Sequence, residues 1–117
     1  MSNTTGIPQA LHEGIPMFSL PNYFEHDAGQ HLHRQAAELF EQGQGSFIID
    51  FQTCSIINSQ GISALMDLAL KCEDDYRGKL VIVNIDNSKI EVLTLVGVIP
   101  LVPVAGDLSE AVRLIKG

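Results

Sequence analysis

The four consecutive residues Asn58-Ser59-Gln60-Gly61 are the part of the sequence whose types and spacing could support chemistry. They follow an apolar segment and precede a helical pattern. The first backbone N–H groups of a helix are unpaired and carry partial positive charge, so a phosphate on a hydroxyl there would be tolerated. The same residues suit a simple helix cap, because Asn and Ser side chains both accept hydrogen bonds from a first turn. Ser59 is therefore either a phosphorylation site or part of a cap without a regulatory role.

The other chemistry-bearing residues indicate no catalytic or metal site. The phosphate-binding patterns G-x-G-x-x-G and G-x-x-x-x-G-K-[ST] and the nucleophile pattern G-x-S-x-G do not occur. His31 and His33 are two residues apart on an expected helix, so their side chains diverge. Asp74-Asp75 stand at a helix end beside Arg77, which is typical of a solvated end. We predict no catalytic residue, no metal and no cofactor, and hence a protein that is not an enzyme.

Length and composition favour one small cytoplasmic domain. The chain has 117 residues, of which 45% are hydrophobic and 18% charged, with a net charge of −7. This charge disfavours nucleic acid and anionic membrane surfaces, and no apolar stretch is long enough for insertion into a membrane. Cys54 and Cys72 lack metal spacing and are expected to pack as reduced thiols. We expect residues 1–6 to be flexible and residues 7–117 to form a single domain.

Hydrophobic periodicity predicts alternating strands and helices. Strands are expected at 7–11 and 15–20, which pair across a turn, and at 46–51, 80–83 and 101–104, the last at a sheet edge. Helices are expected at 27–42, 60–75, about 89–96 and 107–116. Alternation of this kind predicts a compact layered α/β domain with a four- to five-stranded, mostly parallel sheet and about four helices.

The helix after Ser59 has two distinct faces. Its apolar positions predict burial against the sheet for Ile62, Leu65, Met66 and Ala69. Ser63, Asp67 and Lys71 lie four apart and should form one exposed stripe beside Ser59. A partner that senses Ser59 must cover this stripe, so charge reversal at Asp67 or Lys71 is expected to lower partner affinity.

Residues 47–115 resemble the STAS domain, the fold of bacterial anti-sigma factor antagonists and of the cytoplasmic tails of sulfate transporters. The family pattern is an apolar strand ending in Asp, a loop, and Asp-Ser-[Ser/Thr]-Gly-[Leu/Ile] at the start of a helix. The matching residues are Ile48-Ile49-Asp50-Phe51 and Asn58-Ser59-Gln60-Gly61-Ile62. The later elements of the family pattern are matched by Gly78-Lys79-Leu80-Val81-Ile82-Val83-Asn84, by the Leu93-to-Gly97 pattern and by Leu108-x-x-Ala111-Val112. The resemblance implies a STAS fold with a four- to five-stranded sheet.

The resemblance implies a partner-switching regulator. In anti-sigma factor antagonists the Ser of the motif is phosphorylated by a partner kinase, and this Ser aligns with Ser59. The implied partners are an anti-sigma factor that is itself a GHKL-type serine kinase and a metal-dependent serine phosphatase. The implied partner-binding residues are Asn58, Gln60, Gly61, Ser63, Asp67 and Lys71. Phosphorylation would weaken binding through like-charge repulsion and desolvation cost.

Two residues depart from the family pattern and keep alternatives open. Asn58 replaces the family's Asp, and Gln60 replaces a small hydroxyl residue. The second hypothesis is a non-phosphorylated STAS interaction subunit of a membrane transporter or lipid-export complex. The third is a small-molecule-binding or enzymatic α/β domain, for which no motif is found. Self-association as a homodimer also stays open.

Overall fold

The main sheet has four strands in the order β1-β2-β4-β6. The computed structural model describes residues 6–117, so the predicted flexible segment 1–6 lies outside the described residues except for Gly6. Antiparallel pairing joins β1 to β2, and parallel pairing joins β2 to β4 and β4 to β6. The strands are β1 Gln9–His12, β2 Ile15–Ser19, β4 Phe47–Asp50 and β6 Leu80–Val83. The predicted α/β fold and the predicted N-terminal hairpin are both confirmed.

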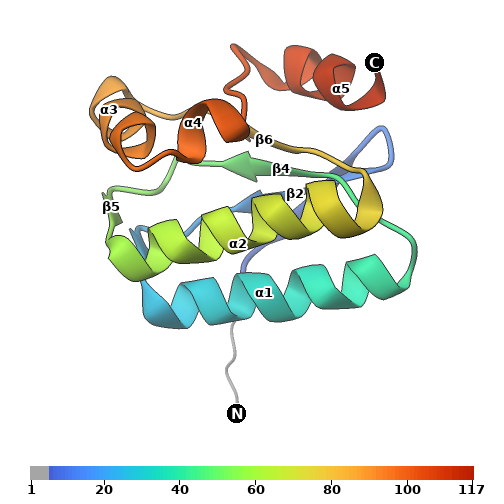
Figure 1. Cartoon of the computed structure of the whole chain (residues 1–117), viewed down its shortest axis with the longest axis horizontal. Helices are drawn as coiled ribbons and strands as arrows, with labels where there is room; N and C mark the ends of the chain where they lie inside the picture. The colour runs from blue at the N-terminus through green and yellow to red at the C-terminus, as the bar shows by residue number, and fades with distance from the viewer. Residues whose placement is uncertain (1–5) are drawn as a thin grey trace.

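Five helices surround this sheet in the described part of the chain. They are α1 His26–Glu41, α2 Ser59–Tyr76, α3 Asn87–Leu95, α4 Val98–Leu101 and α5 Leu108–Lys116. The long helices α1 and α2 lie side by side on one face of the sheet and run in the same direction, whereas α5 covers the opposite face (Figure 1). Parallel strands joined by helical crossovers produce this layered arrangement.

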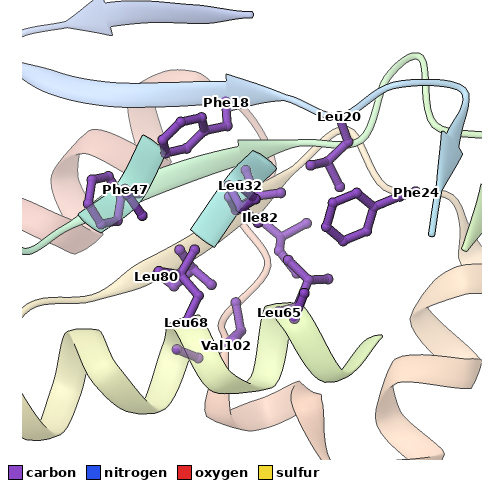
Figure 2. Packing of buried hydrophobic residues seen from close by; sticks show 14 of the residues in the cluster. Phe18, Leu20, Phe24, Leu32, Phe47, Leu65, Leu68, Leu80, Ile82 and Val102 are labelled. Atoms are coloured by element: carbon purple, nitrogen blue, oxygen red, sulfur yellow. The ribbon is translucent and has the colours of Figure 1, made fainter. Parts of the chain in front are cut away.

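The core divides into two clusters because successive strand residues point to opposite faces. Phe47 and Ile49 of β4 belong to the larger cluster, which includes residues of α1 and α2, whereas Ile48 belongs to the cluster beneath α5. Figure 2 shows the larger cluster, with Phe18, Phe47 and Ile82 from the strands facing Leu65 and Leu68 of α2. Burial on both faces explains why these strands read as continuous apolar runs.

Two local predictions were wrong. Residues 101–104 do not form a strand: α4 ends at Leu101, and only an isolated bridge joins Val104 to Ile82. Pro103 has no N–H to donate, so the pairing cannot extend along this segment. The loop predicted at residues 52–57 contains β5 Ile56–Ile57, which pairs in parallel with β3 Tyr23–Phe24 in a second, two-stranded sheet.

Candidate functional site

The structure at the start of α2 shows which residue caps the helix, a point that the sequence left open between Asn58 and Ser59. The Asn58 side chain accepts a hydrogen bond from the backbone N–H of Gly61 at 3.0 Å, so Asn58 is the N-cap. Ser59 is the first helical residue and is exposed. Within residues 6–117 its hydroxyl makes no hydrogen bond. The hydroxyl is therefore free for chemistry at the positive end of an 18-residue helix.

Gly61 lies buried where α2 passes over β3. A Cβ at this position would lie 2.2 Å from the backbone oxygen of Phe24 and 2.9 Å from its ring. Only glycine allows so close an approach without a backbone shift. Gly61 was expected in the partner-binding surface, and the structure places it inside, where it holds the first turn of α2 against β3.

The second sheet ties the loop that precedes Ser59 to the segment that precedes α1. Tyr23 pairs with Ile56 and Phe24 with Ile57. The backbone oxygen of Asn22 also accepts hydrogen bonds from the N–H groups of both Ser55 and Ile56. These bonds hold the segment that enters α2 and thereby position Ser59.

The predicted stripe on α2 is exposed, and its burial pattern needs one correction. Ser63, Asp67 and Lys71 are all exposed, as expected. Ile62 and Met66 are only partly buried, although both were predicted to be buried against the sheet. They lie on the flank of the helix. The buried positions are Gly61, Ala64, Leu65, Leu68, Ala69 and Cys72. Contact of the stripe with a partner stays a prediction.

The surface beside Ser59 is acidic and partly hollow. A hollow of about 330 Å³ lies between the start of α1 and the start of α2, with Asn58 and Gln60 on one side and Glu25 and Asp27 on the other. The two carboxylates come from the first turn of α1 and the residue before it. Ser59 lies between Asn58 and Gln60, so a phosphate on it would stand at a helix N-terminus whose neighbouring residues line this acidic hollow.

Two histidines of α1, His26 and His33, lie beside α2, a position that the sequence does not indicate. His33 shares a 3.0 Å hydrogen bond with the backbone oxygen of Ala64 on α2, and His26 bonds Gln30 at 3.0 Å. In residues 6–117 no group of three or more His, Cys, Asp or Glu side chains could hold a metal ion. The polar spacing of His26, Gln30 and His33 marks one face of α1, but the sequence does not reveal that this face lies beside α2.

Both cysteines are buried and free. Burial raises the pKa of the Cys72 thiol to about 12 and also raises the pKa of Cys54. Desolvation disfavours the thiolate, so the two side chains pack as protonated thiols. This agrees with the predicted structural role.

Comparisons with known proteins identify related folds. A profile of the STAS domain matches residues 9–111. No curated protein sequence matches significantly. Protein TM1081 of Thermotoga maritima is similar in structure, with a TM-score of 0.87 at 11% identity over 99% of this chain and 93% of that one.

Three further solved structures, of two other proteins, are also similar to this chain. The anti-sigma factor antagonist SpoIIAA of Bacillus in its unphosphorylated form matches with a TM-score of 0.73 at 13% identity, over 96% of this chain and 99% of that one. Its phosphorylated form matches with a TM-score of 0.71 at 14% identity, over 93% and 99%. The murine anion transporter Slc26a9 matches with a TM-score of 0.66 at 20% identity, over 88% of this chain and 18% of that one.

Proposed function

Because the chain belongs to the STAS domain family, we propose that it is an anti-sigma factor antagonist-like regulator that acts by partner switching. It binds an anti-sigma factor that is also a GHKL-type serine kinase, and phosphorylation of Ser59 controls this binding. The observation that carries the proposal is the exposed Ser59 hydroxyl at the first residue of α2, with the capping role taken by Asn58. The proposed contact surface comprises Asn58, Gln60, Ser63, Asp67 and Lys71.

The phosphorylation step needs only the hydroxyl from this chain. The Ser59 oxygen attacks the γ-phosphorus of ATP held by the kinase, the bond to ADP breaks, and a base of the kinase takes the hydroxyl proton. A metal-dependent serine phosphatase then hydrolyses the ester to restore the hydroxyl and release inorganic phosphate. This chain supplies no catalytic group in either step, and because kinase and ATP are cytoplasmic the proposal places the protein there.

A phosphate on Ser59 would change binding more than folding. It adds about −1.5 to −2 charges, which the N-terminus of α2 tolerates. A kinase bound at Ser59 must bring its own nucleotide phosphates to the same place, so phosphorylated Ser59 would meet like charges. Binding of the partner would also require desolvation of the new anion, which costs free energy. Both effects weaken the complex and release the partner.

The similarity to SpoIIAA supports this proposal at the level of the fold. SpoIIAA has been solved in unphosphorylated and phosphorylated forms, and both match this chain over nearly its whole length. A fold of this kind therefore accommodates a phosphorylated state. The identities of 13% and 14% carry the comparison no further than the fold.

In vitro phosphorylation tests the proposal directly. The full chain is incubated with ATP and, one at a time, the purified GHKL-type serine kinases encoded in the same genome, and its intact mass is measured. We expect one kinase to add a single phosphoryl group, which peptide fragmentation places on Ser59. Ser59→Ala should stay unmodified, and the matched variant Ser55→Ala, also exposed and four residues earlier, should be modified normally. Modification by none of the kinases, or at another residue, would contradict the proposal.

A second candidate function is a STAS interaction subunit of a membrane transporter or lipid-export complex. The similarity to Slc26a9 favours it, because that transporter contains a segment of this fold within a much longer chain. Within residues 6–117, no helix combines the length and apolar character needed to cross a bilayer. This candidate predicts steady binding to a membrane complex that Ser59→Asp does not change.

A further inference from the structure

A groove runs between α1 and α2, and Gln60, the residue after Ser59, lines its first part. One hollow of about 390 Å³ has His26, Gln30 and His33 on the α1 wall and Gln60, Ser63 and Asp67 on the α2 wall. A second hollow of about 370 Å³ extends toward Phe40 and Lys71. His33 and Asp67 line both hollows, so the two form one groove, which we call the α1–α2 groove.

Small residues at the floor create this groove. Gly29 is buried, and a Cβ there would lie 3.0 Å from the Cβ of Ala64, so the helices touch where both side chains are minimal. His33 spans the contact through its hydrogen bond to the backbone oxygen of Ala64. The longer side chains on either side of the floor then form the walls. The groove is a consequence of packing between rigid helices.

The α2 wall of the groove carries three polar side chains, those of Gln60, Ser63 and Asp67. These side chains make no hydrogen bond or ion pair with any other group in residues 6–117. They present an amide, a hydroxyl and a carboxylate along about 11 Å of helix, from the rise of 1.5 Å per residue. Gln60 lines both the groove and the hollow beside Asn58, so the groove adjoins the two residues on either side of Ser59.

The charges indicate what would bind there. Of residues 6–117, Asp67 is the one carboxylate that lines either hollow of the groove, and it lies where the two hollows meet. An anion would meet Asp67 and a chain of net charge −7. A guanidinium or ammonium group could pair with Asp67 and donate further hydrogen bonds to Ser63 and Gln60. Lys71 lies at the far end and disfavours a second cation there.

We propose that the α1–α2 groove binds a short basic segment of the partner, with an Arg or Lys side chain paired with Asp67. The inference rests on the proposed function and extends its contact surface from α2 to the α1 residues His26, Gln30 and His33. Ser59 and Asp67 are separated by about 12 Å along α2. The basic contact and the phosphate-sensitive contact are therefore distinct parts of one interface.

Peptide selection against the full chain tests the groove without knowledge of the partner. A phage-displayed library of random peptides is selected on the immobilised protein, and enriched peptides are synthesised and titrated by fluorescence anisotropy. We expect enriched peptides to contain Arg or Lys, and Asp67→Lys to raise their Kd at least about tenfold. His33→Ala should also weaken binding. The matched control is Glu73→Lys, the same charge change on α2 in a hollow away from the groove, which should change Kd less than about twofold.

The outcomes separate this inference from the proposed function. Enrichment without basic residues, no enrichment, or equal sensitivity to Asp67→Lys and Glu73→Lys would overturn the groove proposal. If the anti-sigma kinase binds the chain and responds to Ser59→Asp but not to Asp67→Lys, the groove proposal fails while the switch stands. If basic peptides need Asp67 but no anti-sigma factor binds, the groove stands and the assignment of the partner fails.

Discussion

The Asn58 side chain accepts a hydrogen bond from the backbone N–H of Gly61 at 3.0 Å, and among residues 6–117 the hydroxyl of the neighbouring Ser59 makes no hydrogen bond. With Asn58 as the cap, modification of Ser59 and integrity of the helix are independent. A phosphorylated state can therefore differ from the unmodified one in surface charge alone.

Asn58→Asp should leave the fold as stable as before. Asp and Asn cap helices about equally well, and a negative charge is favourable at a helix N-terminus, so the free energy of unfolding should change by less than about 1 kcal/mol. The rate of phosphorylation of Ser59 by the cognate kinase should change, because a carboxylate now stands beside the acceptor. Urea unfolding and a timed phosphorylation assay measure the two effects. An unchanged rate would mean that the side chain at 58 serves the helix only.

Gly61→Ala should destabilise the protein strongly. The added methyl group would lie 2.2 Å from the backbone oxygen of Phe24, which can yield only if α2 or β3 moves. Overpacking of this kind costs about 1–3 kcal/mol, and we expect the upper end because the contact is with backbone. Gly106→Ala is the control, since its methyl would meet only the flexible Glu110 side chain, at 3.2 Å. Equal unfolding midpoints for the two variants would refute the packing role.

The sequence predicts the elements with strong hydrophobic patterns and misses those made by a few backbone bonds. Residues 80–83 are recognisable because a strand buried on both faces is continuously apolar. The pairing of Tyr23-Phe24 with Ile56-Ile57 has no such pattern, since each strand is two residues long and half exposed. The α1 wall of the groove could not be predicted for another reason. The sequence shows that one face of a helix is polar but not which neighbouring helix that face lies beside. The close approach of Gly29 to Ala64 and the hydrogen bond between His33 and the backbone oxygen of Ala64 settle this.

Native Cys72 should resist alkylation. Its pKa is raised to about 12 by burial, so at pH 8.5 almost no thiolate exists and the side chain is also inaccessible. Iodoacetamide should modify Cys72 only in denaturant, as measured by mass spectrometry. The unfolded state ionises near the ordinary pKa of about 8.5 while the folded state does not, so stability should fall as pH rises from about 9 toward 12. Rapid alkylation of the folded protein would contradict this account.

Asp86 should stabilise the protein at neutral pH and cease to do so in acid. The hydrogen bond from the Lys89 ammonium, at 2.6 Å, and those from the Lys89 N–H and the Ser88 hydroxyl hold the pKa of Asp86 well below its usual range. A lowered folded pKa contributes stability above the unfolded value of about 3.9 and loses it as pH falls below that value.

The variant Asp86→Asn keeps a capping side chain but leaves the ammonium of Lys89, whose side chain is only 11% exposed, without its counter-ion. Its melting temperature should lie below that of the native protein at pH 7. The two should converge as pH is lowered from about 4 toward 2. A difference that stays constant over this range would show that the charge of Asp86 is not involved.

Isothermal titration calorimetry with the cognate anti-sigma kinase tests the central claim most directly. The proteins compared are the unmodified chain, Ser59→Ala and Ser59→Asp, after circular dichroism has shown that all three are equally folded. Ser59 as a switch predicts that the unmodified chain and Ser59→Ala bind alike and that Ser59→Asp binds at least about tenfold more weakly, because a fixed negative charge replaces the free hydroxyl. Equal affinity of all three forms would contradict the switch and favour a constitutive interaction subunit.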